Sequence, residues 1–202
     1  SAPDKFVQEV LWRTYWKGWL EMRPQVWRAY RERLEADRDD LTSAELERLH
    51  SAVRGETDIE CFNHWARELT QTGYLHNHVR MWFASIWIFT LRLPWALGAD
   101  FFLRHLLDGD PASNTLSWRW VCGLHTAGKT YLARASNIAR YTDKRFNPRG
   151  QLAASAPPVT ETHVHPTRPL PAAHEMPDDE RFGLLLTEED VGAHSLLDNR
   201  TP

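Results

Sequence analysis

Three short segments of the chain hold most of the residues whose side chains suit ligand binding or catalysis. These segments are Glu9–Arg13, Thr72–Met81 and Leu107–Trp120. In the second segment, Asn77 and Arg80 are three residues apart, so a helix would place both on one face. In the third, Asp108 lies in a turn before an expected helix. Its carboxylate can pair with a guanidinium through two hydrogen bonds, and Arg80 is a candidate partner.

Asn114 and Trp118 extend this set of residues toward a binding pocket. An amide, an Arg–Asp pair and a large aromatic ring around one space suit a planar, hydrogen-bonding ligand with a phosphate or ribose tail. The chain has ten tryptophans, all between Trp12 and Trp120. Core packing is the simplest explanation of such side chains, and stacking on a flat ligand or carrying electrons are the functional alternatives.

Helices must position these segments, because hydrophobic residues recur at helical spacing through the first 145 residues and no strand-like alternation stands out. We predict helices over residues 6–20, 25–36, 43–50, 59–70, 75–91, 94–107, 113–123 and 130–141. Thr42 or Ser43 can cap the third helix and Asp58 the fourth. Gly55 and Gly73 are suited to end helices. The predicted fold class is all-α.

A change of composition near residue 150 predicts a helical domain over residues 1–150, followed by a linker and tail over residues 151–202. Residues 153–171 are rich in Pro, Ala and Thr, which indicates an extended linker. The net charge of the chain is −3. Residues 151–202 contribute nine acidic and three basic side chains, so the first 150 residues are mildly basic. This distribution permits DNA as a partner of the helical domain.

The second and third segments together resemble the DNA photolyase/cryptochrome family. Thr72-Gly-Tyr-x-His-Asn-x-x-Arg-Met81 and Asp108-Gly-Asp-x-x-x-Asn-x-x-x-Trp-x-Trp120 match its motifs in order, residue type and spacing. The resemblance covers about residues 5–150 and is closest to the cyclobutane pyrimidine dimer photolyases. It implies an all-α, FAD-binding helical domain that is the C-terminal portion of a longer protein. An α/β antenna domain and a phosphate-binding segment are expected upstream, and the expected state is a monomer.

Carried over residue by residue, the resemblance implies a flavin pocket made of Tyr74, Asn77, Arg80, Phe102, Asp108, Asp110 and Asn114. Arg80 and Asp108 would form an ion pair against the isoalloxazine. Asn114 would face the reactive ring nitrogen, where an amide can donate a hydrogen bond and stabilise the reduced flavin. Many signalling cryptochromes have a different residue at this position, so Asn114 favours repair.

The resemblance also implies a lesion pocket made of Glu9, Trp12, Asn77, Met81 and Trp120, with Arg13 near the flanking phosphates and His78 in place of an Arg-type contact. A dimer must leave the duplex before a flavin can reach it, and a flipped base needs aromatic faces for stacking. Trp12 and Trp120 can supply these faces. Glu9 can hydrogen-bond a base edge or a protonated radical intermediate. Photolyases for (6-4) lesions have histidines at the positions of Asn77 and Met81, so the pattern favours cyclobutane dimers.

An electron relay is a further implication of the resemblance. Trp118 and Trp95 would be the first two members of a relay that photoreduces oxidised flavin. The third, surface tryptophan of the family falls at residues 39–44 of this chain, where no tryptophan is present. Other residues that could take its place are Trp16, Trp27, Trp65 or a tyrosine.

The function that follows is light-driven repair of cyclobutane pyrimidine dimers in DNA, by electron transfer from reduced FAD. The alternative is a cryptochrome-like, FAD-binding blue-light sensor or regulator without repair activity. A third interpretation is a helical domain with only a structural role, which the absence of the phosphate-binding segment from this sequence would explain. The lesion-pocket residues Glu9, Trp12, Met81 and Trp120 favour repair over light sensing, and visible absorption by bound flavin would test the structural interpretation.

Several other patterns have simpler explanations. Residues 123–130 match the phosphate-binding P-loop literally, but a helical, Trp-rich stretch precedes them and no strand ending in Asp follows. His76 and His78 are two apart, so on a helix they cannot share one metal ion, and no metal site is predicted.

The longest apolar run, residues 82–91, is too short to span a membrane. Two well-separated cysteines favour a reducing, cytoplasmic compartment.

Overall fold

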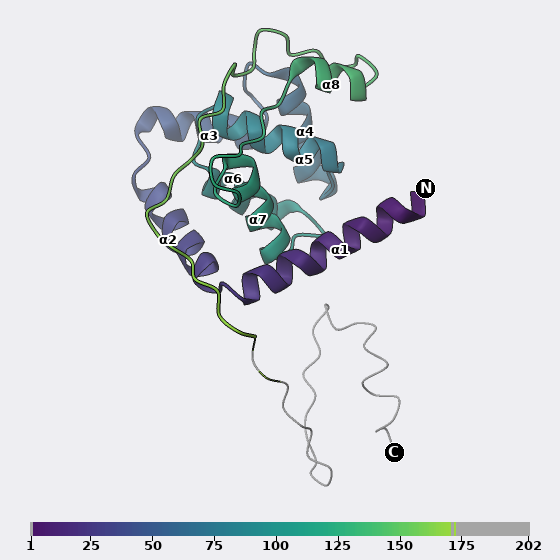
Figure 1. The fold of residues 1–202 in the computed structure, drawn as a ribbon. Coiled ribbons are helices and arrows are strands. Elements are labelled where there is room, and N and C mark those ends of the chain that lie inside the picture. The colour runs from purple at the N-terminus through teal and green to yellow at the C-terminus, as the bar shows by residue number, and fades with distance from the viewer. Residues whose placement is uncertain (1, 171, 173–202) are drawn as a thin grey trace, which may run out of the picture. The chain divides into compact units, whose positions relative to one another are not determined.

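The structure of the protein is a computed structural model that describes residues 2–170 and 172 (Figure 1). Within these residues the fold is all-α, as predicted, and contains no strand. The helices are α1 (Ala2–Glu21), α2 (Gln25–Asp39), α3 (Ser43–Arg54), α4 (Glu60–Thr72), α5 (Asn77–Ser85), the π-helix η1 (Ile86–Thr90), α6 (Trp95–His105), α7 (Pro111–Cys122) and α8 (Ala135–Tyr141). No helix in the described part of the chain is long and apolar enough to cross a membrane.

Local signals set several of the helix ends. The Thr42 hydroxyl accepts a hydrogen bond from the Glu45 backbone N–H, and the Glu45 carboxylate accepts one from the Thr42 backbone N–H. This reciprocal pair satisfies two backbone donors at the start of α3. Gly55 ends α3 and Gly73 ends α4, each in the left-handed backbone conformation that glycine adopts without steric cost. The predicted caps at Thr42, Gly55 and Gly73 are therefore confirmed.

Several predicted elements differ from the observed ones. Helix α1 begins four residues before its predicted start, and α3 ends four residues after its predicted end. The helix predicted over residues 75–91 begins only at Asn77 and its last turn is the π-helix η1, in which Leu91 N–H donates to the Ile86 carbonyl. The last helix begins at Ala135 instead of residue 130. Asp58 does not cap α4, because Ile59 occupies that position and makes no side-chain cap. The spacing of apolar residues cannot reveal a π-turn, since the residues remain apolar whichever helix type is formed.

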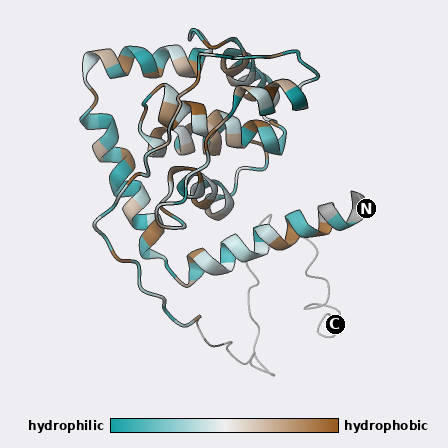
Figure 2. Cartoon of the chain, turned by 45° about the horizontal axis from the view of Figure 1, so that its top comes forward, coloured by the Kyte–Doolittle hydropathy of each residue, from teal (hydrophilic) through white to brown (hydrophobic). Residues whose placement is uncertain are grey.

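The hydrophobic core is built largely from aromatic rings on α4, α5, η1, α6 and α7. Phe83 stacks on Phe62 with ring centroids 4.2 Å apart, and Trp87 stacks on Phe101 at 6.0 Å. Within this core, α7 packs against α1, α5 and α6. By contrast, α1 carries exposed hydrophobic side chains, which include Val7 and Leu11. The hydrophobic stretches of this helix are brown in Figure 2.

Residues 151–168, here called the strap, run as an extended segment along the helical body. Ala153 N–H donates to the Thr90 hydroxyl, Val159 N–H to the Cys122 carbonyl, and Arg168 N–H to the Met22 carbonyl. The strap therefore makes hydrogen bonds with the ends of η1, α7 and α1. Composition suggested a domain boundary at residue 150, whereas the compact unit extends to Leu170. Most of the acidic tail, residues 173–202, lies outside the described residues.

One buried ion pair joins the strap to α7. The Arg119 guanidinium is almost fully buried and donates two hydrogen bonds to the Glu161 carboxylate. His165 lies 3.2 Å from the same carboxylate. This contact links residues 42 positions apart, and the Pro-rich composition of the strap gave no indication of it.

Candidate functional site

A cavity of about 830 Å³ lies between α1, α5, α6 and α7 and contains most of the residues that the sequence singled out. Helix α5 contributes Asn77, Arg80, Met81 and Ala84. Their spacing of three, one and three residues places them on a single face of the helix. The volume is within the range of about 300–1,000 Å³ that is usual for small-molecule and cofactor sites.

Helix α7 supplies the opposite wall through a second face of regular helical spacing, made of Ser113, Asn114, Ser117, Trp118 and Val121. The helix begins in the Asp110-Pro111 sequence. The Asp110 carboxylate accepts a hydrogen bond of 2.7 Å from the Ser113 backbone N–H, and Pro111 occupies the first turn, where its missing N–H costs nothing. Asp110 therefore fixes where α7 starts and so where Asn114 lies. Its carboxylate is also 3.7 Å from the Lys17 ammonium on α1.

Arg80 and Asp108 form the ion pair that the sequence predicted. Two parallel hydrogen bonds of 3.0 Å join the guanidinium to the carboxylate, and the third nitrogen, Nε, donates to the Leu75 carbonyl. Three hydrogen bonds hold the guanidinium plane in one orientation at the cavity wall. The pair thus combines a fixed cation with a carboxylate that remains half-exposed.

The Asn114 side chain is buried beside the cavity. Its amide nitrogen donates a hydrogen bond of 2.7 Å to the Ala99 carbonyl on α6. An amide nitrogen carries two hydrogens, so this bond fixes the orientation of the side chain and leaves a second N–H that can donate to a ligand. The residue is consequently suited to contact a polar edge of a bound ring.

Aromatic side chains form much of the remaining surface of the cavity. Phe102 and Trp118 meet edge to face with centroids 5.1 Å apart, and Trp120 stacks on Tyr131 at 5.6 Å. The Trp118 ring packs so closely on Gly98 that a Cβ at this glycine would lie 2.3 Å from the ring. The Trp118 indole N–H is buried without a partner in the described structure. A buried donor without a partner costs about 1–3 kcal/mol, which a bound acceptor can relieve.

Helix α1 closes the cavity on a third side with Glu9, Trp12 and Arg13. Trp12 is nearly half exposed and stacks on Trp16, with centroids 5.9 Å apart. Glu9 and Arg13 are exposed at the same edge. The cavity therefore opens past an aromatic face with one acidic and one basic side chain beside it.

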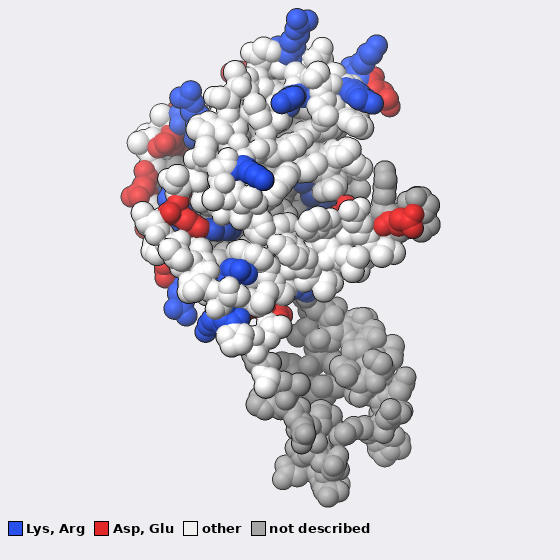
Figure 3. Space-filling view, in the orientation of Figure 1, with Lys and Arg blue, Asp and Glu red and all other residues white. Residues whose placement is uncertain are grey.

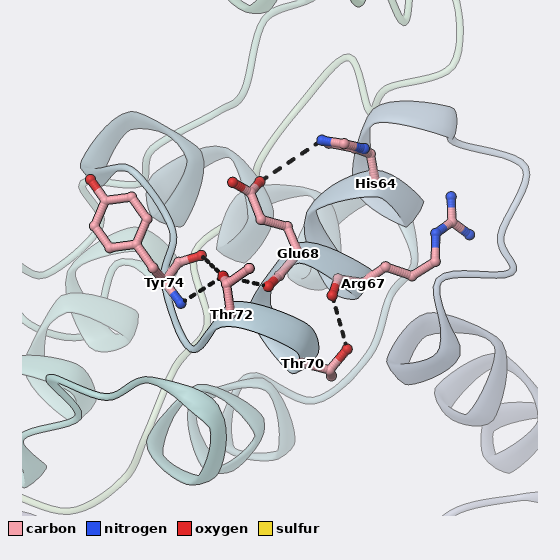
Figure 4. Close-up of polar contacts among 6 residues, drawn as sticks. All are labelled: His64, Arg67, Glu68, Thr70, Thr72 and Tyr74. Atoms are coloured by element: carbon pink, nitrogen blue, oxygen red, sulfur yellow. Dashed lines mark hydrogen bonds and ion pairs between the residues drawn. The ribbon is translucent and has the colours of Figure 1, made fainter.

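Three of the predicted site residues do not line the cavity. Tyr74 is exposed in the turn after α4, where the Thr72 hydroxyl bonds to its backbone (Figure 4). His78 packs edge-on against Tyr141 and tilted on Trp82, on a different face of α5 from Asn77. Trp95 is buried under α2, in contact with Tyr30. The family resemblance placed Tyr74 and His78 in the site near Asn77, but the turn at Gly73 and the pitch of α5 point them elsewhere.

His125 is a cavity residue that the sequence analysis missed. Its ring lies edge-on to Trp16 at 4.7 Å, and burial together with the charges of Arg119 and Arg23 lowers the pKa of its imidazole below the usual value. His125 belongs to the loop that matches the P-loop pattern. That loop follows helix α7 and not a strand, so its context differs from that of a phosphate-binding P-loop. No group of three metal-ligating side chains occurs among residues 2–170.

Comparison with known proteins gives the family. The profile of the family described as the FAD binding domain of DNA photolyase matches residues 6–167. The chain belongs to this family. It is 35% identical over 148 residues to a deoxyribodipyrimidine photo-lyase of Streptomyces griseus, covering 73% of this chain and 31% of the relative. It is 31% identical over 174 residues to the enzyme of that name from Alkalihalophilus pseudofirmus, covering 81% and 34%. The chain thus spans about a third of the length of these relatives.

FAD is the cofactor of this domain family, and the chemistry of the cavity fits it. The wall provides a fixed guanidinium at Arg80, amides at Asn77 and Asn114, and flat aromatic surfaces at Phe102 and Trp118. Planar rings stack on aromatic faces. Amides form hydrogen bonds with the polar ring edge, and a guanidinium forms hydrogen bonds with phosphate or carbonyl oxygens. The donor set therefore suits an isoalloxazine better than a wholly apolar or metal ligand.

Proposed function

We propose that the full-length protein repairs cyclobutane pyrimidine dimers in DNA, using light and reduced FAD held in the cavity. One observation carries this proposal: a single cavity brings the flavin-type residues Arg80, Asp108 and Asn114 together with the lesion-type residues Glu9, Trp12 and Trp120. The matched relatives are named deoxyribodipyrimidine photo-lyase, which supports the same reaction class. The bound flavin, when reduced and excited by light, supplies the electron.

The protein residues have positioning and electrostatic tasks in this reaction. Arg80, held by Asp108 and the Leu75 carbonyl, places a fixed positive charge beside the electron-rich reduced cofactor. Asn114 offers its second amide N–H to the ring edge, which stabilises negative charge there. Both groups are held before the ligand binds, so little reorganisation is needed when charge moves.

The flipped dimer is accommodated by the outer half of the cavity. Trp12 and Trp120 offer aromatic faces for its bases, while Met81 and Asn77 on α5 form the floor between dimer and cofactor. Glu9 accepts a hydrogen bond from a base edge. One electron enters the dimer, the two carbon–carbon bonds that join the pyrimidines break, and the electron returns, so the reaction has no net redox change.

Charge gives DNA no broad attachment surface on the face that Figure 3 shows. In Figure 3 the positive and negative side chains are interspersed over the visible face and do not form a patch of one sign. Arg13 lies at the cavity edge, where it can contact a flanking phosphate. We further propose that an upstream α/β domain completes the protein and that it works in the cytoplasm.

A repair assay tests the proposal against the light-sensor alternative. Chemically reduced full-length protein is mixed with a dimer-containing oligonucleotide under blue light, and restored thymines are counted. We expect restoration in the light, none in darkness, and a strong loss in the Glu9→Gln and Trp120→Ala variants. Flavin binding without restoration would favour the sensor and contradict repair.

A further inference from the structure

A continuous series of aromatic rings leads from α6 across α2. Trp95 on α6 packs against Tyr30 on α2 with ring centroids 5.7 Å apart and an interplanar angle of 37°. Tyr30 in turn packs against Trp27, one helical turn earlier on α2, at 5.2 Å and 41°. Each ring therefore contacts the next, and easily oxidised side chains occupy every position in the series.

The inner end of this series is adjacent to the flavin cavity. Trp118 lines the cavity and packs directly on Gly98 of α6. Gly98 and Trp95 are three residues apart, so they lie on neighbouring turns of the same helix face. Trp118 is 2% exposed and Trp95 5% exposed, so both rings are shielded from water.

The outer end of the series reaches the surface. Tyr30 is 1% exposed, but Trp27 is only partly buried. Trp27 and Tyr30 line a surface hollow of about 150 Å³ together with Arg31, Arg38 and Asp100. The series therefore leads from the buried Trp95, which is one helical turn from the Gly98 contact of Trp118, to solvent at Trp27.

We propose that Tyr30 and Trp27 form the outer part of an electron relay, in the order Trp118, Trp95, Tyr30, Trp27. The inference rests on the proposed function, because it assumes an oxidised, light-excited flavin in the cavity. Trp118 loses one electron to that flavin, and each ring then takes an electron from the next one outward. The net result is that Trp27 has lost one electron and the flavin has gained one. An added thiol reductant restores Trp27 for the next cycle.

The surroundings of the two outer rings assign them different roles. The Tyr30 hydroxyl is buried and has no hydrogen-bond partner, and burial raises the pKa of its phenol above the usual value. An oxidised phenol is stable only after it releases its proton, and no acceptor is present at Tyr30. Trp27 therefore gives an electron to the oxidised Tyr30 and becomes the oxidised ring, and its indole proton can leave to water. Positive side chains nearby, such as Arg31, oppose a cation radical and favour this proton loss.

The same contacts exclude the other tryptophans considered as outer members. Trp65 has ring contacts with Trp82 and Phe146, on the other side of the core. Trp16 has ring contacts with Trp12, Tyr15 and His125 on the cavity side. Within the described residues, neither has a ring contact with Trp95. Among the tryptophans that the structure describes, Trp27 is linked to Trp95 through Tyr30 and is itself partly exposed.

Flash photolysis of the full-length protein with oxidised FAD tests the relay. The measured quantity is the transient absorption of the tryptophan radical, its yield and its lifetime. The variants are Trp27→Phe and Tyr30→Phe, with Trp19→Phe as the matched control, since Trp19 is also half-buried but contacts Arg23 and His125. Tyr30→Phe keeps the ring and removes only a hydroxyl without a partner, so the fold is expected to persist.

We expect the long-lived radical to disappear in Trp27→Phe and Tyr30→Phe. In both variants the electron returns quickly from the flavin to the oxidised ring. Steady-state photoreduction with thiol should fall severalfold in both variants, and Trp19→Phe should behave like the wild type. Wild-type radical lifetimes in both variants, an equal loss in Trp19→Phe, or no radical in the wild type would each overturn the relay. Repair by chemically reduced protein should be unchanged in Trp27→Phe. A long-lived radical in a protein that repairs no dimer would support the relay and contradict the proposed function.

Discussion

At the scale of single residues, the cavity depends on side chains whose orientation is fixed before any ligand binds. Arg80 makes three hydrogen bonds, Asn114 is held by the Ala99 carbonyl, and Trp118 is held against Gly98. The residue types made Arg80 a candidate partner for Asp108, and the family resemblance implied their ion pair. The fixation of Asn114 was not predictable, because its partner is a backbone carbonyl on another helix.

Trp12 offers a residue-scale test of the lesion pocket. Replacing it by alanine removes one stacking face at the cavity edge, and each base stack is worth roughly 1–3 kcal/mol. We expect Trp12→Ala to weaken binding of dimer-containing DNA by about tenfold or more. Fluorescence anisotropy with damaged and undamaged oligonucleotides measures this.

The control for that test is Leu11→Ala on the same helix. Leu11 is more exposed than Trp12 and does not line the cavity, so its replacement should leave the affinity unchanged. Equal weakening in both variants would mean that α1 acts through general hydrophobic contact and not through stacking by Trp12.

At the scale of elements, the close packing of α6 on α7 depends on one glycine. A methyl group at Gly98 would lie 2.3 Å from Trp118 and 2.9 Å from the Trp87 indole nitrogen. We expect Gly98→Ala to lower the free energy of unfolding by about 1–3 kcal/mol, because the core must be displaced to accept it. Urea denaturation of the purified protein measures the change.

Gly18 in α1 provides the opposite case within the same protein. A Cβ at this position would meet no atom within 4 Å, so alanine brings only its higher helix propensity. Gly18→Ala should therefore raise the free energy of unfolding by about 0.5–1 kcal/mol. If both substitutions destabilised the protein to the same extent, close packing at Gly98 would not be the cause.

The strap is tied to α7 by a charge pair whose strength depends on pH. Burial alone would raise the pKa of Glu161, but hydrogen bonds and charge from Arg119, with His165, hold it below its usual value of 4.5. The folded protein therefore binds this proton less readily than the unfolded chain does. The stabilisation is fully present above the usual pKa and is lost as the pH falls through the lower folded value.

Glu161→Gln should consequently lower the free energy of unfolding by about 2 kcal/mol at neutral pH, since Arg119 remains buried with a weaker partner. The difference from the wild type should shrink as the pH falls below 4.5. Urea denaturation over a pH series measures both effects. The control is Glu56→Gln, which alters an exposed pair with Arg54 and should change stability little at any pH.

Some features of these elements could be predicted from the sequence, and others could not. Helix order, most helix ends and the all-α class followed from apolar spacing and from residues such as Thr42 and Gly73, because these signals are local. The role of residues 151–168 did not follow, since Pro- and Ala-rich composition is equally compatible with a free linker and with a strap. The decisive contact, between Glu161 and Arg119, joins distant parts of the chain.

At the scale of the whole molecule, charge is distributed unevenly along the chain. Residues 171–202 contain eight acidic and two basic side chains, whereas the first 150 residues are mildly basic. An acidic segment joined to a DNA-binding domain adds negative charge that opposes the binding of phosphates. We expect removal of residues 171–202 to strengthen binding of undamaged DNA at low salt, with the difference vanishing at high salt. Filter binding over a salt series would measure this, and an unchanged affinity would argue against the effect.

The central claim concerns the whole cavity: Arg80 and its neighbours hold the flavin. The most direct measurement is the visible absorption of bound FAD in purified full-length protein, compared between wild type, Arg80→Leu and the control Arg54→Leu, which alters an exposed Arg–Glu pair away from the cavity. We predict flavin in the wild type and the control and a large loss in Arg80→Leu. Full flavin binding by Arg80→Leu, or none by the wild type, would contradict the claim.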